Sequence, residues 1–208
     1  MVTTKILIGG GEIYAQDAEI AQKIRGEVIC ADGGSAHADA MGLSVGAIVG
    51  DLDSYDPKSK DGAEIFPVED QDRTDFQKAL AHIGDDFAYC FGFWGKRLDH
   101  SLAALSAIAE HHAGRALLFT EEDICFLAPS SITLDLKAGD AIAFYPLSES
   151  TASSEGLAYP LDDLSLSPTD RISSSNRALG PVTVSNVTGH LLVILPKAKL
   201  SVIDAALL

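Results

Sequence analysis

Four aspartates stand out in this chain because each follows a short apolar segment and lies close to the expected start of a helix. In an open α/β sheet, loops at the carboxyl ends of parallel strands gather at one edge, where ligands bind. Four carboxylates at one edge would repel one another unless a cation joined them. A hard divalent ion is the economical choice, most simply Mg²⁺ carried with a phosphate substrate. The spacing therefore favours a phosphoryl-type transferase. The four residues are Asp51, Asp53, Asp75 and Asp99.

The pair Asp51 and Asp53 carries the strongest metal signal. Alternate positions of an extended segment point to one side, so these two carboxylates would offer Mg²⁺ adjacent oxygen ligands. An Asx-turn is the simpler interpretation of the same segment. Asp75 either faces the metal edge or complements the dipole of the helix that it opens, and Asp99 either faces that edge or is an N-cap. Their shared position at one expected edge favours the site.

Cations and glycines near the same edge would suit a nucleotide. Arg97, with Lys96 or Arg73, is one of few cations near this edge and could clamp a phosphate oxygen, because a guanidinium group binds such oxygens through two donors. Asp32-Gly33-Gly34 follows an apolar segment, where the glycines allow a ligand to approach the main chain and Asp32 can accept hydrogen bonds. A simple helix-entry turn is the alternative interpretation of these three residues.

A further glycine turn, Gly9-Gly10-Gly11, follows the first apolar segment. It is either a phosphate cradle or a tight turn. It does not match G-x-G-x-x-G, and no P-loop lysine follows it, so a Rossmann dehydrogenase and a P-loop kinase are both disfavoured. No G-x-S-x-G elbow and no Cys/His pair points to covalent catalysis.

The elements that would position these residues alternate between strands and helices in the first part of the chain. The clearest helix is 74–83, where Thr74 and Gln77 have the spacing of a capping box and Gly84 provides a stop. A second strong helix, 99–112, carries Leu102, Leu105, Ile108 and Ala109 at helical spacing. Further helices are expected at 17–25 and 35–41, and strands at 5–9, 27–31, 46–50, 64–67, 87–93 and 115–120.

The pattern changes after residue 121, where strand-like runs recur without a convincing helix. Strands are expected at 124–127, 132–136, 141–145, 182–187 and 191–195, with loops at 148–154 and 173–176. We therefore expect an α/β domain with a mostly parallel, Rossmann-like sheet over 1–120 and an antiparallel β-sandwich over 121–208.

The composition narrows the possible partners and surroundings. The chain has 208 residues, is 47% hydrophobic and carries a formal net charge of −15, so nucleic acids and anionic membranes are poor partners. Its three cysteines are far apart and read as free, buried thiols in a reducing compartment. The start has no signal-peptide h-region, and no apolar run is long enough to span a bilayer. We expect a soluble cytoplasmic protein.

Several short motifs occur in a specific order along nearly the whole chain. They are Ala31-Asp32-Gly33-Gly34, Gly50-Asp51-Leu52-Asp53-Ser54, Gln71-Asp72-Arg73-Thr74-Asp75, Arg97-Leu98-Asp99-His100, and the stretches 156–161 and 174–176. Any one of these motifs is short, but the ordered set is specific. Together they resemble the thiamine pyrophosphokinase family.

The resemblance implies both a fold and a reaction. It implies an N-terminal α/β domain that binds ATP with Mg²⁺, and a C-terminal β-sandwich. It also implies a homodimer that holds thiamine between the α/β domain of one subunit and the sandwich of the other. The reaction transfers the β,γ-pyrophosphoryl group of ATP to the thiamine hydroxyl, giving thiamine diphosphate and AMP.

The resemblance also assigns roles to individual residues. Asp51, Asp53 and Asp75 would hold Mg²⁺ and, with Asp99, orient the thiamine hydroxyl, while Arg97 would hold phosphates. Asp32 and Gln71 would contact thiamine or lie near it, with Ser175 and Asn176 supplied by the partner subunit. Apart from the resemblance, we expect Gly33, Gly34 and Lys96 to contribute to nucleotide binding and Thr74 to substrate binding. The chain departs from the family pattern at Lys96, where glycine is common, at 43–45, where a proline is often found, and at Arg177, near a position that is often acidic.

General chemistry agrees with this assignment and leaves alternatives. An acidic pocket attracts the positive thiazolium ring, and phosphoryl-type transfer needs mainly positioning and charge neutralisation. Asp75 or Asp99 could take the proton of the hydroxyl. The alternatives are another Mg²⁺-dependent nucleotide phosphohydrolase or transferase, and a non-catalytic thiamine or nucleotide sensor. Retention of all four aspartates and Arg97 weighs against the sensor.

Overall fold

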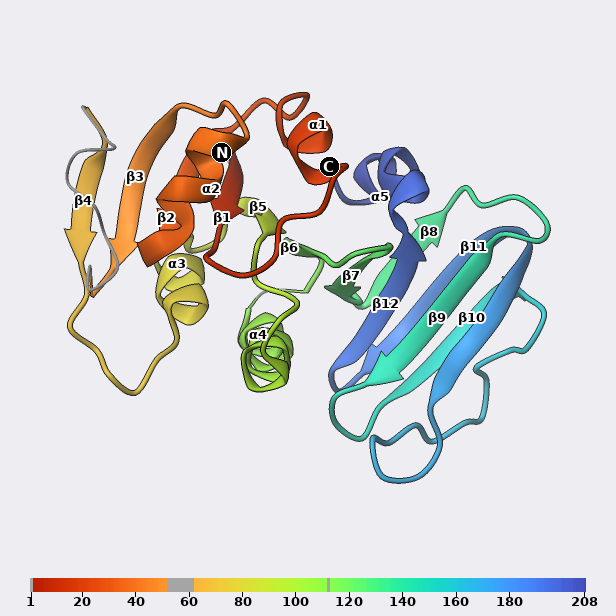
Figure 1. The fold of residues 1–208 in the computed structure, drawn as a ribbon. Helices are drawn as coiled ribbons and strands as arrows, with labels where there is room; N and C mark the ends of the chain where they lie inside the picture. The colour runs from red at the N-terminus through yellow and green to blue at the C-terminus, as the bar shows by residue number, and fades with distance from the viewer. Residues whose placement is uncertain (1, 52–61, 112) are drawn as a thin grey trace. The chain divides into compact units, whose positions relative to one another are not determined.

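The computed structural model describes residues 2–51, 62–111 and 113–208. The chain divides into two compact units, Met1–His111 with Ala116–Glu121 and His112–Arg115 with Glu122–Leu208 (Figure 1). Among the helices in the described ranges, none is both long enough and apolar enough to cross a membrane.

The N-terminal unit is built on strands that run parallel to their neighbours. Their order is β6-β5-β1-β2-β3-β4, and each of these adjacent pairs is parallel. Across the whole chain, parallel pairs in this unit and antiparallel pairs in the other make the sheet mixed. The strands are β1 (Thr4–Ile8), β2 (Glu27–Ala31), β3 (Val45–Gly50), β4 (Glu64–Pro67), β5 (Phe87–Phe91) and β6 (Ala116–Phe119).

The core of this unit forms because its central strands are apolar along their whole length. Every residue of β5 is buried, as are Ile6, Leu7 and Ile8 of β1. Such continuous apolar runs are typical of strands covered on both faces. The helices are α1 (Asp17–Ala21), α2 (Ser35–Ala40), α3 (Asp75–Ile83) and α4 (Leu98–Glu110), and a 3₁₀ turn, Asp32–Gly34, precedes α2.

Helix α3 forms as the sequence predicts. Thr74 is its N-cap and completes a capping box with Gln77, and Gly84 ends it at φ +59°. Its apolar stripe is buried and includes Phe76 and Leu80.

Helix α4 differs from its prediction. Its N-cap is Arg97, so the alternative that Asp99 caps this helix is wrong. The expected apolar face is confirmed only at Ile108, which is buried; Leu102 is 54% exposed, and Ser101, Ala104 and Ala107 are buried in its place. Small residues let this helix pack closely against its own unit, which leaves the leucine outside.

The C-terminal unit consists of antiparallel pairs in the order β10-β11-β9-β12-β7, with β8 also paired to β11. The long strand β11 pairs with β9 near its start and with β8 near its end. The strands are β7 (Asp123–Leu127), β8 (Ser131–Leu134), β9 (Ala141–Pro146), β10 (Thr151–Leu157), β11 (Ser173–Thr188) and β12 (Leu191–Pro196).

Three expectations for this unit are wrong. The stretches 148–154 and 173–176 were expected to be loops, but the first runs into β10 and the second starts β11. A helix, α5 (Leu200–Leu207), follows the last strand. The serine-rich strands are stabilised by pairing with their neighbours, which a polar sequence does not reveal.

The three cysteines are buried thiols that form no disulfide within the described residues, in agreement with the prediction. Burial raises the pKa of the Cys125 thiol to about 12. All three thiols belong to the packed core, and the raised pKa makes Cys125 a poor nucleophile.

Candidate active site

A pocket of about 530 Å³ opens in the N-terminal unit where the chain leaves β1, β2 and β5. This is the edge at which the sequence places the candidate residues. The pocket brings together Asp32, Gly33, Thr74, Asp75, Lys96 and Arg97, all of which were predicted site residues. Its other lining residues are Gly9, Gly10, Gly11, Ala31, Phe76, Gly92, Phe93, Gly95, His100, Ala103 and Ala104.

The glycine turn after β1 lies against the loop after β5. The N–H of Gly11 donates to the carbonyl oxygen of Gly92 at 2.6 Å. A Cβ atom at Gly9 or Gly11 would lie 2.5 or 2.6 Å from that same oxygen, whereas a Cβ at Gly10 would have no neighbour closer than 3.9 Å. The turn is therefore both a close backbone approach and part of the pocket wall.

The Asp32-Gly33-Gly34 turn also needs its glycine for packing. A Cβ at Gly34 would lie 2.0 Å from the carbonyl oxygen of Ile8, so this residue lets the start of α2 approach β1. Among the described residues that line the pocket, Gly33 is present and Gly34 is not. Asp32 is buried and has φ +42°, a left-handed conformation that aspartate tolerates better than most residues.

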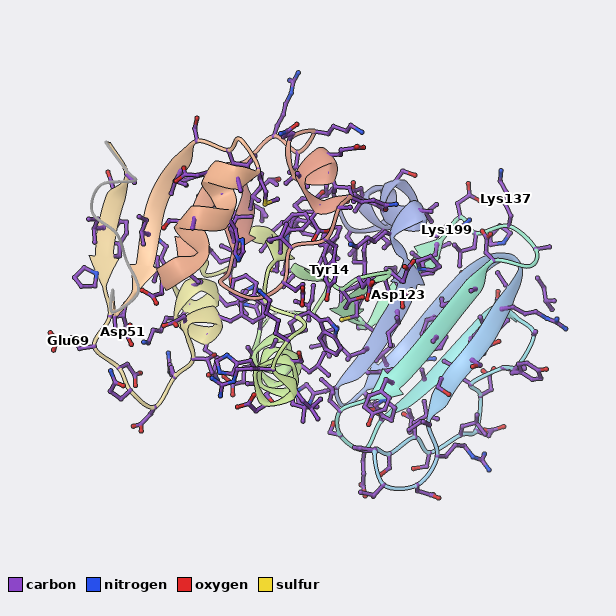
Figure 2. All side chains as sticks on the ribbon, viewed as in Figure 1. Tyr14, Asp51, Glu69, Asp123, Lys137 and Lys199 are labelled. Atoms are coloured by element: carbon purple, nitrogen blue, oxygen red, sulfur yellow. The ribbon has the colours of Figure 1, made fainter. Side chains whose placement is uncertain are left out.

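Two of the predicted metal ligands share a lysine. Nζ of Lys78 lies 3.1 Å from Oδ1 of Asp75 and 3.6 Å from Oδ2 of Asp51. The Lys78 side chain is only 2% exposed. Asp51 follows the end of β3, where Figure 2 labels it. An ammonium group of the chain itself therefore joins these carboxylates.

Lys78 was not among the site residues predicted from the sequence. The available signal was its spacing three residues after Asp75, which places the two on one helix face. An acid–lysine pair at this spacing normally lies on a solvated surface. Here the apolar stem is buried with the core face of α3, and the ammonium group reaches the acidic edge.

Burial and mutual contact shift the pKa values of Asp75 and Lys78. Burial raises the pKa of Asp75; Lys78 opposes that effect, and the charges of Asp51 and Asp32 add to it. Burial also disfavours the charge on Lys78, but its contacts with Asp75 and Asp51 outweigh that effect and leave the pKa of Lys78 raised. The carboxylates of Asp51 and Asp32 are thus near enough to Asp75 to act on its pKa.

These carboxylates have the donor chemistry for a hard cation such as Mg²⁺, which prefers oxygen ligands. Asp51 and Asp75 each present an oxygen within 4 Å of one nitrogen atom, so the two groups converge on a common point. Within the described part of the chain, no group of three or more His, Cys, Asp or Glu is arranged to hold a metal. Asp53, the remaining predicted ligand, lies outside the described residues.

Arg97 and Asp99 form a pair at the start of α4. Nη2 of Arg97 lies 2.5 Å from Oδ2 of Asp99, and Nε lies 3.1 Å from Oδ1. Both side chains are about two-thirds exposed. The hydrogen bond from Arg97 lowers the pKa of Asp99 to about 2. Arg97 lines the pocket, whereas Asp99 is not among the described lining residues.

The remaining predicted residues have more local roles. Thr74 engages Gln77 in the capping box of α3. Gln71 is exposed in the turn before α3 and is absent from the described pocket wall.

The two candidates in the C-terminal unit differ in exposure. Ser175 is exposed and Asn176 is buried. The Asn176 amide donates to the carbonyl oxygen of Tyr159 at 2.7 Å and accepts from the N–H groups of Tyr159 and Arg177. Asn176 therefore holds the main chain beside it.

An aromatic pair is a further feature of the pocket that the sequence did not predict. The rings of Phe76 and Phe93 stack with centroids 4.0 Å apart, and both residues line the pocket. They give one wall an apolar surface beside the charged groups. No sequence signal links the two residues, because they come from different elements.

Both parts of the chain match known family models. Residues 22–118 match the model described as thiamin pyrophosphokinase, catalytic domain. Residues 130–191 match the model described as thiamin pyrophosphokinase, vitamin B1 binding domain.

The chain is also similar to individual proteins in sequence and in structure. The chain is 28% identical over 163 residues to thiamine pyrophosphokinase 3 of Oryza sativa subsp. japonica, a match that spans 68% of this chain and 61% of the rice protein. A solved protein from Lactobacillus plantarum is similar with a TM-score of 0.77 at 24% identity, covering 94% of this chain and 98% of that one. Thiamine pyrophosphokinase from Bacillus subtilis gives 0.75 at 20% identity, covering 93% and 98%. At these identities the two solved structures establish a common fold.

Proposed function

This chain belongs to the thiamin pyrophosphokinase family, and from that premise we propose that it transfers the pyrophosphoryl group of ATP to the hydroxyl of thiamine. The products are thiamine diphosphate and AMP. The observation that carries the proposal is one pocket that contains both Asp32 and Asp75 and both Lys96 and Arg97. Carboxylates attract a thiazolium cation and a hard metal, and the two cations attract phosphate.

The two units take different parts in this proposal. Residues 1–120, which make up most of the N-terminal unit, would form the Rossmann-like domain that binds ATP. Residues 121–208, which make up most of the C-terminal unit, would form the β-sandwich that binds thiamine. The matches to a catalytic and a vitamin B1 binding model support this division. The parallel pairs of the first unit and the antiparallel pairs of the second agree with it.

The metal of the proposed reaction is Mg²⁺, held by Asp51 and Asp75 together with Asp53. When bound, it would neutralise negative charge on the phosphate oxygens. The convergence of Asp51 and Asp75 on Lys78 supports this assignment, because the same oxygens that bind an ammonium group suit a hard cation.

The chain's own residues would bind the phosphates of ATP and orient and deprotonate the thiamine hydroxyl. Arg97 would exchange Asp99 for phosphate oxygens, since its guanidinium already makes a two-point contact with a carboxylate. Asp75 or Asp99 would accept the proton of the thiamine hydroxyl, whose oxygen then bonds to the β-phosphorus. The bond between the β-phosphorus and the oxygen that links it to the α-phosphorus breaks, and AMP leaves with that oxygen.

A second copy of the chain would complete the thiamine site in a homodimer, with Ser175 and Asn176 as partner-supplied residues. Leu98 and Leu102 support a covered face, because both leucines lie one turn apart on α4 and are 72% and 54% exposed. Dilution that separates the subunits should abolish specific activity. Full activity in the separated subunits would exclude a shared site.

The cellular setting remains part of the same proposal. Buried cysteines that form no disulfide support a reducing, cytoplasmic location. The net charge of −15 supports small-molecule partners over nucleic acid.

The test is whether ATP consumption depends on thiamine. The protein with ATP and Mg²⁺ should form AMP only when thiamine is added. AMP or ADP formation without thiamine would indicate a nucleotide hydrolase, and use of a nucleotide sugar would indicate a glycosyl transferase. Binding of ATP or thiamine without turnover would indicate a sensor.

Two substitutions test whether turnover in that assay depends on the proposed metal ligands. Asp75→Asn should lose most turnover while keeping the circular dichroism spectrum of the wild type, and Asp53→Asn should do the same. Asp72→Asn is the matched control, because Asp72 is exposed in the turn just before α3 and its substitution changes the net charge by the same amount. Full turnover in Asp75→Asn would remove this residue from the site.

A further inference from the structure

Lys96 has an unusual backbone conformation in the wall of the pocket. Its φ is +55°, in the left-handed region that residues other than glycine rarely adopt. Unlike Asp32, which is also left-handed, lysine has no short polar side chain that stabilises this conformation locally. Strained residues of this kind persist at ligand sites when the surrounding structure enforces them.

Hydrogen bonds of the residues that flank Lys96 explain how its backbone conformation is enforced. Gly95, at φ +93°, precedes Lys96, and the N–H of Arg97 donates to the carbonyl oxygen of Gly95 at 2.7 Å. The N–H of Gly95 itself donates to Oγ of Ser101 at 3.1 Å. The turn is therefore fixed to the first turns of α4, and Lys96 stands at the entrance of that helix.

The other cations near the pocket already have acidic partners. Arg97 is bound at two points by Asp99. Lys78 is buried between Asp75 and Asp51. For Lys96, by contrast, no carboxylate within the described ranges lies at ion-pair distance, and its side chain is exposed. An incoming anion therefore meets the charge of Lys96 without displacing a partner.

We propose that Lys96 is a polyphosphate-binding residue, which selects nucleotides with a long phosphate chain over AMP. This inference rests on the proposed function and adds a specificity-determining residue to it. An ammonium group interacts with phosphate mainly through charge, so ATP should gain more from it than AMP does. The start of α4 adds to the same field, because a helix N-terminus favours anions. Release of AMP after transfer would be eased by the same preference.

The experiment compares ATP and AMP binding by calorimetry, at low and at physiological salt, in the wild type, Lys96→Gln, Lys96→Gly and Lys96→Arg. Lys96→Gln removes the charge and keeps a side chain at the left-handed position. Lys96→Gly removes the charge and also the backbone strain. Lys23→Gln is the control, since Lys23 is an exposed lysine of the same unit outside the described pocket wall.

The expected result is a Kd for ATP that rises about tenfold in Lys96→Gln and Lys96→Gly, with a smaller rise at higher salt. The Kd for AMP should change less than about threefold, and Lys96→Arg should bind ATP nearly as the wild type does. The melting temperature of Lys96→Gly should equal or exceed that of the wild type, because glycine adopts φ +55° freely. Lys23→Gln should change neither affinity.

The outcomes separate this inference from the proposed function. Unchanged ATP affinity in both Lys96→Gln and Lys96→Gly would overturn the role of Lys96, as would an equal loss for ATP and AMP. A wild type that binds ATP but forms no thiamine diphosphate would overturn the proposed function, and the affinities would still decide the role of Lys96. A wild type without affinity for ATP would overturn both.

Discussion

Nζ of Lys78 lies 3.1 Å from Oδ1 of Asp75, one turn along the helix that opens at the pocket. The same nitrogen is 3.6 Å from Asp51, at the end of β3. Lys78 is therefore one cation that joins these two carboxylates. A divalent ion that binds here would share Asp51 and Asp75 with this ammonium group.

Replacing Lys78 by methionine should destabilise the fold and lower turnover. The substitution keeps the apolar stem but leaves Asp75 and Asp51 without their counter-ion. Because these carboxylates are partly exposed, we expect a loss of about 1–3 kcal/mol, below the range for a fully buried pair. Urea unfolding measures the change, with the exposed Lys23→Met as control. A Lys78→Met protein as stable as the wild type would show that the pair contributes little.

The pKa of Asp99 reports its contact with Arg97. Carbon NMR of the carboxyl group should give about 2 in the wild type, against an ordinary value of 3.8. A lowered pKa in the folded state means that the stability from this pair is present above 3.8 and is lost as the pH falls through about 2. Arg97→Gln should return the pKa of Asp99 toward its ordinary value, and Arg73→Gln should not. An ordinary pKa in the wild type would contradict the pairing.

The glycine turn should tolerate a methyl group at one position and reject it at the next. Gly11→Ala would place Cβ 2.6 Å from the carbonyl oxygen of Gly92, whereas Gly10→Ala meets nothing closer than 3.9 Å. We expect Gly11→Ala to lose roughly 1–3 kcal/mol of stability and Gly10→Ala to lose little. Thermal unfolding of the two variants tests this difference. Equal melting temperatures would show that the two loops move apart at little cost.

Substitution of Thr74 distinguishes a role in capping α3 from a role in binding the substrate. Its hydroxyl accepts from the N–H of Gln77 at 3.3 Å within the capping box. Thr74→Ala should therefore lose about 1 kcal/mol of stability, and Thr74→Ser should restore it. Steady-state kinetics on both variants adds the second readout. A rise in the KM for thiamine in Thr74→Ala that Thr74→Ser fully reverses would support the binding role, and an unchanged KM would leave capping alone.

Local signals predicted the parts of the fold that local interactions stabilise. The capping box at Thr74 and the stop at Gly84 specify α3 from within a few residues. The buried face of α4 depends on which side chains fit against the rest of the unit, so Leu102 was misplaced. The strands β10 and β11 are rich in serine and form through their pairing with each other. Periodicity in a single segment cannot reveal that pairing.

The site likewise contains residues that the sequence predicted and one that it could not predict. The carboxyl ends of parallel strands brought Asp32, Asp75, Lys96 and Arg97 to one pocket, because sheet topology alone fixes that edge. The burial of Lys78 could not be predicted, since it depends on how α3 packs on β2 and β3. Resemblance to a family supplied the identity of the substrates, which no single motif defines.

The measurement that tests the central claim most directly is phosphorus NMR of the products formed from ATP, Mg²⁺ and thiamine. We predict thiamine diphosphate and AMP in equal amounts, with no ADP. ADP together with thiamine monophosphate would contradict pyrophosphoryl transfer while keeping the pocket as a kinase site. Loss of ATP without any phosphorylated thiamine would contradict the account as a whole.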